Sequence, residues 1–356
     1  MWKKAFFTVS LLVGVGLFVF IINKFGGFGK ALEAVGSIGW TGVSLFVLTS
    51  AGTLIFPAIG WWILMRGEGL RIPLWTVLKA NFMGFPINFI APSMYLGAEP
   101  LKTFYIAHVH GEPKRRILAT LIVSKFQEIG SLLFLMIVAS GVALWKIEFT
   151  RRQEILLVSA MAFLLLVFGM TLYAFVGNFK PTVKVINFIA MIFKKGRRRL
   201  ARLRTRAEEM ERLIQAAFTK RWKTFFAAQA MTLLSAVSVL IRPWLYFAFS
   251  REILFVGVED LCAIFIVTNL INMLPHTPGA LGVMEGGMVA LFLILRLGTA
   301  HDATAYQMVG RLADVVLILL GAWLIFHYNL QAMAKRVAKG EEQALMKDAE
   351  EAGLRQ

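Results

Sequence analysis

The stretch Leu274-Pro-His-Thr-Pro-Gly-Ala-Leu-Gly-Val-Met-Glu285 decides the fold of this chain. It belongs to an uncharged run, residues 261–284, that has the length of a membrane span, for which about 20 apolar residues suffice. Two prolines and two glycines interrupt the run: Pro275, Pro278, Gly279 and Gly282. Proline breaks a helix, and broken backbone at membrane depth is tolerated only inside protein or beside a water-filled cavity. We therefore interpret this run as a re-entrant helical hairpin.

A second uncharged run, residues 81–98, has the same character, because Pro86, Pro92 and Gly97 interrupt it. We interpret it as another re-entrant hairpin. Six further runs have the length and apolar character of full spans: Ala5–Asn23, Trp40–Met65, Arg116–Trp145, Ile155–Phe179, Thr224–Ile241 with its continuation to Ser250, and Ala303–His327. The sequence thus predicts an all-α fold, a polytopic transmembrane helical bundle.

The composition supports a membrane protein. The chain has 356 residues, of which 58% are hydrophobic and 17% are charged, whereas a soluble domain has about 25% charged residues. The net charge is +17, and the basic residues lie between the apolar runs. An anionic membrane surface is therefore favoured over nucleic acid as their partner. One cysteine, Cys262, excludes a disulfide framework and a cysteine-based metal site.

The distribution of basic residues predicts the topology. Residues 180–223 hold 14 basic residues and three acids, and basic loops stay in the cytoplasm. Apolar residues recur within this segment, which predicts an interfacial, amphipathic element. Both termini then lie in the cytoplasm, and residues 331–356 form a short charged tail. A plain count of eight spans places the termini on the same sides, so the rule does not choose between the two topologies.

An internal repeat relates two parts of the chain, residues 39–145 and 224–328. When Pro57 is placed against Pro243, the residues that follow align without a gap: Pro92 with Pro278, Glu99 with Glu285, Lys125 with Arg311, and Glu128 with Asp314. A chance match of two apolar stretches is the alternative, but charges inside spans are rare. The expected topology makes the two repeats inverted, each with a re-entrant hairpin, as in many secondary transporters.

These residues also carry a resemblance to a known family. The family has a first element in which a proline is followed by a glycine, an acid and a second proline, and it is resembled by Ala91-Pro-Ser-Met-Tyr-Leu-Gly-Ala-Glu-Pro-Leu-Lys102. The second element of the family has the pattern Pro-Gly-x-x-Gly-x-x-Glu, and residues 274–285 resemble it. The basic-x-x-acid pairs that begin at Lys125 and Arg311 fit as well. Over residues 5–330 the chain is similar to the transmembrane, flippase-like domain of lysylphosphatidylglycerol synthases, also called the multiple peptide resistance factor family.

The resemblance implies a protein of the bacterial or archaeal plasma membrane that moves lipid headgroups between leaflets. Anionic or aminoacylated phospholipids are the implied partners. The best-known relatives carry a C-terminal synthase domain, but only a short stretch, residues 328–356, follows the last span, so we expect no such domain in this chain. A Gly-Ala-Glu triplet and a Lys-led pair are two smaller departures from the family pattern.

Six ionisable residues inside apolar runs are the main candidates for function. Glu99 and Glu285 either cap broken helices or bind a cationic headgroup or a coupling proton. The i,i+3 spacing places each basic residue and its acid on one helix face. Lys125 with Glu128, and Arg311 with Asp314, are then either structural ion pairs or phosphate ligands with their orienting acids.

Further candidates lie close to these groups in the sequence. Arg242 either faces the expected cavity and attracts phosphate, or extends to the outer interface. Several polar side chains would line the path or satisfy broken-helix backbone: Asn88, Asn269, Asn272, Tyr95 and His276. Other residues would form the hairpin backbone, with the glycines permitting tight turns: Pro92, Gly97, Pro278, Gly279 and Gly282.

Signatures of catalysis are weak. Gly26-Gly-Phe-Gly-Lys30 lacks the spacing of a P-loop, and His108-x-His110 has no partnered carboxylate. We find no nucleophile elbow, and we expect no catalytic residue, metal or cofactor. The predicted function is lipid translocation through a charged cavity between inverted repeats. A membrane-embedded lipid-modifying enzyme and a partner subunit of a separate lipid synthase remain the alternatives; the sequence gives neither the lipid nor the oligomeric state.

Overall fold

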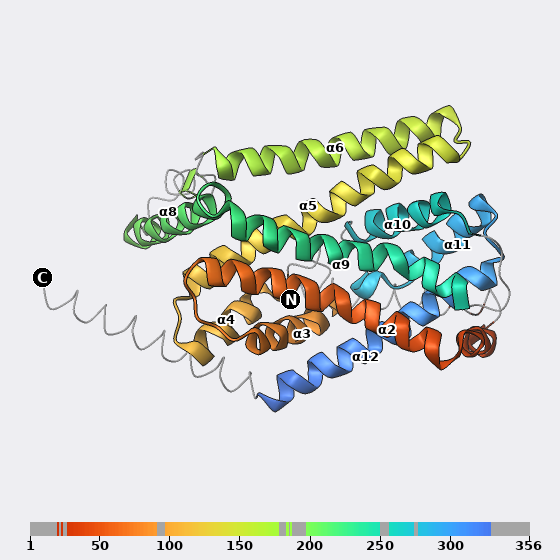
Figure 1. Cartoon of the computed structure of the whole chain (residues 1–356), viewed down its shortest axis with the longest axis horizontal. Coiled ribbons are helices and arrows are strands. Elements are labelled where there is room, and N and C mark those ends of the chain that lie inside the picture. Colours follow the sequence, from red (N-terminus) through yellow and green to blue (C-terminus); the bar gives the residue numbers. More distant parts are fainter. Residues whose placement is uncertain are drawn as a thin grey trace, which may run out of the picture.

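A computed structural model describes residues 20, 23, 27–90, 97–177, 183–184, 186, 197–249, 256–273 and 277–328. Within these ranges the chain is helical and has no strand (Figure 1). The helices are α2 (Gly27–Gly67), α3 (Leu74–Ile90), α4 (Glu99–His110), α5 (Lys114–Lys146), α6 (Arg151–Val176), α8 (Arg197–Thr219), α9 (Trp222–Phe249), α10 (Val258–Met273), the short η1 (Pro278–Ala280), α11 (Val283–Leu295) and α12 (Ala300–His327). The all-α prediction is confirmed.

Five helices in this part of the chain are long and apolar enough to cross a membrane. They occupy Ile38–Gly67 of α2, Lys114–Lys146, Arg151–Ala174, Trp222–Phe249 and Ala300–His327. These segments agree with five of the six predicted spans. The sixth, Ala5–Asn23, lies outside the described residues, as does the tail 331–356. The protein is therefore a multi-pass membrane protein.

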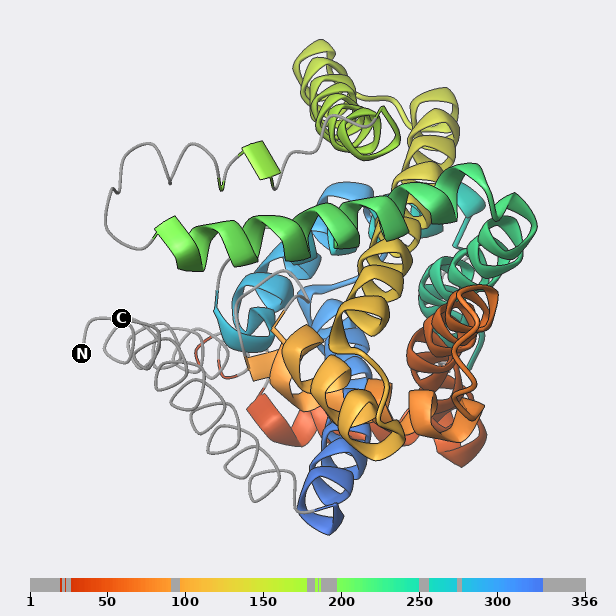
Figure 2. The same ribbon diagram turned by 90° about the vertical axis from the view of Figure 1, so that its left-hand side faces the viewer.

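Two pairs of shorter helices complete the bundle. The pair α3 and α4 has 17 and 12 residues, and the pair α10 and α11 has 16 and 13, so each helix is shorter than the roughly 20 residues of a typical span. The two pairs lie at opposite ends of the long axis (Figure 1). Viewed from one end, α3 and α4 are in front and α10 and α11 are behind (Figure 2). Their interpretation as re-entrant hairpins of an inverted repeat stays a prediction.

The expectation that Pro86 interrupts its run is wrong, because α3 continues through Pro86 to Ile90. Pro86 is buried where α3 packs against α12. At that contact α12 has Gly321, and a Cβ there would lie 2.7 Å from Pro86 Cδ and also collide with the Phe82 carbonyl oxygen. The absent side chain lets the two backbones approach closely, as small residues do between membrane helices.

Polar side chains connect the spans inside the bundle. Between α5 and α9, Ser131 Oγ lies 2.8 Å from Thr232 Oγ1, and Gln229 Nε2 donates to Ser131 Oγ over 2.6 Å. Between α2 and α5, Trp61 Nε1 donates to Thr120 Oγ1 over 3.0 Å. Hydrogen bonds of this kind stabilise helix association in lipid. They hold α5 against both α2 and α9.

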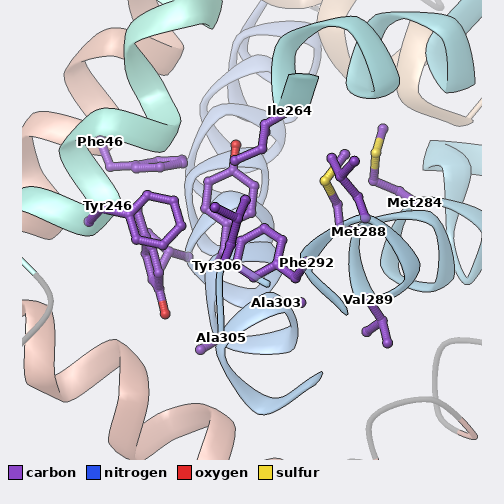
Figure 3. Packing of buried hydrophobic residues seen from close by; sticks show 14 of the residues in the cluster. Phe46, Tyr246, Ile264, Met284, Met288, Val289, Phe292, Ala303, Ala305 and Tyr306 are labelled. Atoms are coloured by element: carbon purple, nitrogen blue, oxygen red, sulfur yellow. The ribbon is translucent and has the colours of Figure 1, made fainter. Parts of the chain in front are cut away.

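An aromatic cluster joins the α11–α12 end of the bundle to α2 and α9 (Figure 3). Tyr306 of α12 lies at its centre, with ring centroids 5.3 Å from Tyr246, 6.1 Å from Phe292 and 6.3 Å from Phe46. Such offset and edge-on pairs are favourable beyond the area that they bury. The cluster fixes α11 and the start of α12 against the spans.

Exposed tryptophans lie near the ends of several helices. Trp40, Trp75 and Trp222 lie near the starts of the spanning part of α2, of α3 and of α9, and Trp145, Trp244 and Trp323 lie near the ends of α5, α9 and α12. Tryptophan is enriched at both membrane–water interfaces. On α9, Trp222 and Trp244 are both exposed and occupy opposite ends of the same span.

Helix α8, inside the basic segment 180–223, is tied to the bundle by ion pairs. Arg115 at the start of α5 pairs with Glu209 of α8. Glu68, in the turn between α2 and α3, is buried and pairs with Arg221, next to the start of α9, and with Arg116 at 3.9 Å. These contacts gather three helix junctions at one end of the bundle.

Candidate functional site

The first charged group, which we name the first triad, consists of Glu99, Lys125 and Glu128. Glu99 is the first residue of α4, and the other two lie one turn apart on α5. Lys125 Nζ lies 2.7 Å from Glu128 Oε2 and 3.8 Å from Glu99 Oε1. In the described part of the chain, neither Glu99 oxygen accepts a hydrogen bond. The fold thus brings together three charges that the sequence places on two different helices.

The start of α4 is held by an amide from α3. Asn88 Oδ1 accepts a hydrogen bond from the Ala98 backbone N–H over 2.8 Å. The first N–H groups of a helix have no partner within the helix, so Asn88 satisfies one donor where the chain resumes helical structure. The sequence leaves two possible roles for Asn88, lining the path or accepting a hydrogen bond from broken-helix backbone, and this contact corresponds to the second.

The second triad consists of Glu285, Arg311 and Asp314. Glu285 is 1% exposed, and its Oε2 accepts a hydrogen bond from the Gly282 N–H over 2.7 Å, which caps α11. Arg311 Nε and Nη2 lie 2.8 and 2.7 Å from Glu285 Oε1, and Asp314 Oδ2 lies 3.7 Å from Arg311 Nη1. The acid therefore caps a helix and also pairs with the arginine.

The two helix pairs meet beside the second triad. Arg311 Nη1 donates to the Gly279 carbonyl over 2.7 Å, and the guanidinium lies 5.9 Å from the ring centroid of Phe89 at the end of α3. Gly279 has φ of 60°, and a Cβ there would collide with the Phe89 ring. Glycine is required for both reasons. Arg311 therefore connects the break before α11 with the end of α3.

A cavity of about 210 Å³ lies between the two halves of the bundle. Its charged and amide lining comes from α3, α4, α5, α9, α10 and α12: Asn81, Asn88, Lys102, Lys125, Glu128, Arg242, Asn269, Asn272 and Asp314. A single buried water needs about 15 Å³ of such space. The cavity, which we name the central cavity, therefore has room for several waters or for a small polar group.

Lys102 is a cavity residue that the sequence analysis did not single out. Its side chain is buried, and Nζ donates to Asn81 Oδ1 over 2.7 Å. Asn81 Nδ2 in turn donates to the Leu54 carbonyl over 2.6 Å. The available signal was its place one helical turn after Glu99. Comparison of the repeats did not select Lys102, because Met288 occupies the equivalent position in the second repeat.

Of the remaining candidates, some line the central cavity, some lie next to it, and some lie outside the described residues. Arg242 and Asn272 line the central cavity, and Arg242 Nη2 lies 3.4 Å from Thr53 Oγ1. Glu99, Glu285 and Arg311 border the cavity region without belonging to its lining. Gly97 lies in the bend before α4, and Pro278 begins η1. Three others lie outside the described residues: Pro92, Tyr95 and His276.

The protein groups at the site are ion-paired side chains and amides. Over the described ranges, no three His, Cys, Asp or Glu side chains gather in a way that would hold a metal. His108 stacks on Phe104 at 6.0 Å, and a ring nitrogen of His110 lies 3.1 Å from Thr76 Oγ1. The paired cations, carboxylates and amides offer binding to a small charged group.

Helical spans around a charge-lined interior cavity define a polytopic membrane protein with a polar site between its helices. The chain belongs to the family of the lysylphosphatidylglycerol synthase transmembrane region, whose model matches residues 7–334. This match confirms the family resemblance.

Archaeal membrane proteins are among the similar chains. Two UPF0104 membrane proteins of Methanothermobacter thermautotrophicus are 21% identical over 337 residues and 26% identical over 349 residues. These matches span 93% and 91% of this chain, and 95% and 93% of the relatives. A UPF0104 membrane protein of Methanocaldococcus jannaschii is 22% identical over 314 residues, spanning 87% of this chain and 91% of the relative. No solved structure matches the chain.

Proposed function

We propose that this protein moves the polar headgroup of a membrane lipid between leaflets through the central cavity. One observation carries the proposal: both halves of the bundle contribute charged side chains to the same cavity, with Lys125 and Glu128 from one and Arg242 and Asp314 from the other. The family match supports a membrane protein related to lipid metabolism.

The cavity lining would lower the barrier that the lipid tails impose on a charged headgroup. A charge that leaves water for an apolar medium pays a large desolvation cost unless it is paired or hydrogen-bonded. The cations, carboxylates and amides of the cavity lining would together replace part of the hydration of a charged headgroup. The acyl chains would stay in the bilayer, against the exposed apolar surfaces of the spans.

The contact between the two helix pairs would provide the conformational step. In the present structure Phe89 lies against Gly279 and Arg311. We propose that this contact opens and closes as the cavity is exposed to either leaflet in turn. Two short helix pairs from opposite ends of the bundle suit such alternating exposure.

A liposome assay tests the proposal. Purified protein in liposomes is expected to speed the exchange of fluorescent phospholipids between leaflets well above the rate in empty liposomes. Glu128→Gln and Asp314→Asn are expected to slow exchange at least about tenfold, the effect of losing one charge-assisted contact, because each removes a cavity charge while its basic neighbour keeps a second acid. Exposed Glu148, between α5 and α6, provides the matched control Glu148→Gln, which should exchange at the wild-type rate.

Wild-type liposomes that exchange no faster than empty ones, over a panel of anionic, zwitterionic and aminoacylated lipids, would contradict the proposal. Mass spectrometry of lipids from cells lacking the protein adds a second criterion. Altered sidedness of an existing lipid supports translocation, whereas a missing lipid species would indicate an enzyme instead.

A further inference from the structure

Two of the three cations that the sequence suggests for phosphate binding, Lys125 and Arg311, are already paired with carboxylates. Lys125 forms ion pairs with Glu99 and Glu128, and Arg311 forms ion pairs with Glu285 and Asp314. Each triad thus carries two acids for one base, a formal charge of −1. An anion that approached Lys125 or Arg311 would meet these carboxylates as well. The phosphate ligand must be sought elsewhere in the cavity.

Lys102 and Arg242 differ from the triad cations in their place in the repeat. Each is supplied by one half of the bundle alone, because Met288 and Phe56 occupy the equivalent positions of the other half. Lys102 also bonds to a neutral amide, and within the described chain it forms no ion pair with a carboxylate. Both cations line the central cavity, and their two positive charges stand beside the two triads, which carry −1 each.

We infer that Lys102 and Arg242 bind the phosphate of an anionic lipid headgroup and make the central cavity selective for headgroups with net negative charge. This inference rests on the proposed function. It assigns the phosphate to the two cations that the repeat does not duplicate, one from α4 and one from α9, and leaves the triads to hold the two helix pairs in place. A headgroup that carries its own ammonium group would bring a positive charge against the same two cations and therefore bind less well.

The surroundings of Lys102 fit this role. An ammonium group has three N–H donors, and the Asn81 oxygen accepts one of them, so a phosphate oxygen can accept another. Asn81 is itself fixed by the Leu54 carbonyl, which positions the lysine. Gly84 of α3 leaves room for the lysine side chain, because a Cβ there would collide with Lys102 Cε. A guanidinium such as that of Arg242 binds phosphate through paired N–H groups.

The test compares two lipids in the same liposomes. Wild-type protein is expected to exchange fluorescent phosphatidylglycerol on the order of tenfold faster than phosphatidylcholine, because both lipids offer a phosphate but only phosphatidylcholine also brings a fixed positive charge against the two cations. Lys102→Met, which introduces the residue found in the other half, is expected to slow the exchange of both lipids, and that of phosphatidylglycerol more, so that this ratio falls close to one. Lys102→Arg should keep the ratio. The control Lys79→Met removes a lysine that bonds to Tyr328 outside the cavity and should leave the ratio unchanged.

The outcomes separate the inference from the proposed function. Exchange of both lipids at equal wild-type rates, or a ratio that survives Lys102→Met, overturns the inference and leaves translocation intact. No exchange of either lipid overturns both. A further arm supplies labelled glycerol 3-phosphate outside the liposomes. Its uptake without lipid exchange would assign the phosphate site to a soluble anion and overturn the lipid assignment.

Discussion

Replacing Arg311 with alanine is expected to lower the free energy of unfolding by about 3–5 kcal/mol, the cost of leaving a buried charge without its partner. Glu285 is 1% exposed, and Arg311 supplies its ion pair as well as a hydrogen bond to the Gly279 carbonyl. The variant thus leaves the Glu285 carboxylate without its ion pair, with only the Gly282 N–H bond to Oε2, and leaves the Gly279 carbonyl without the Arg311 donor. Thermal unfolding in detergent and in lipid nanodiscs measures the loss.

Two further variants separate charge from geometry. Arg311→Lys keeps the charge but loses the planar fork whose separate nitrogens contact Glu285 and the Gly279 carbonyl; we expect an intermediate loss. In Arg311→Met with Glu285→Gln, the uncompensated charge is gone, and stability should partly recover. A stability of Arg311→Ala within about 0.5 kcal/mol of wild type, the range of ordinary surface substitutions, contradicts the proposed structural role of this arginine.

Gly321→Ala is expected to destabilise the protein by about 1–3 kcal/mol, the usual cost of inserting a methyl group into a packed interior. The new Cβ would lie 2.7 Å from Pro86 Cδ and would also meet the Phe82 carbonyl oxygen, which is backbone and cannot rotate away. Helices α3 and α12 would have to separate. Since α3 contributes Asn81 and Asn88 to the central cavity, exchange activity should fall together with stability.

Gly310→Ala is the matched control on the same helix. No atom lies within 4 Å of a Cβ built at Gly310, and alanine favours a helix over glycine by about 1 kcal/mol. This variant should unfold at or above the wild-type temperature. Equal effects of the two substitutions would show that helix propensity, and not the close approach of α3 and α12, sets the outcome.

The sequence predicts the spans and the charged residues because both leave local patterns. Long uncharged runs identify the membrane helices, and a charge inside such a run is costly enough to indicate a function or a partner. The equal separation of acid and base in the two repeats therefore finds both triads, although Glu99 and Lys125 lie on different helices. Asn88 bonds to the Ala98 N–H and also lines the central cavity, so both alternatives for it stay open, and no spacing in the sequence indicates that bond.

Contacts between distant segments leave no such pattern. Phe89 against Gly279 joins the two halves of the chain, and neither residue type is unusual in a membrane helix. Pro86 appeared to interrupt a helix, yet α3 continues through it at the point where the helix packs closely against Gly321 of α12. Lys102 was not predicted because comparison of the repeats selects residues that both halves share, whereas the other half has Met288 at the equivalent position.

The separation of the α9 tryptophans has a consequence for the choice of membrane. Trp222 and Trp244 lie about six helical turns apart on one helix, which is about 33 Å at a rise of about 1.5 Å per residue. This length is close to the hydrocarbon thickness of an ordinary bilayer, about 30 Å. In short-chain lipid the helix must tilt or the bilayer must stretch around it, and each ångström of hydrophobic mismatch costs a fraction of a kcal/mol. The acyl-chain length of the surrounding lipid, in the cell or in a reconstituted bilayer, therefore affects the tilt of this helix and the free energy of the protein in the membrane.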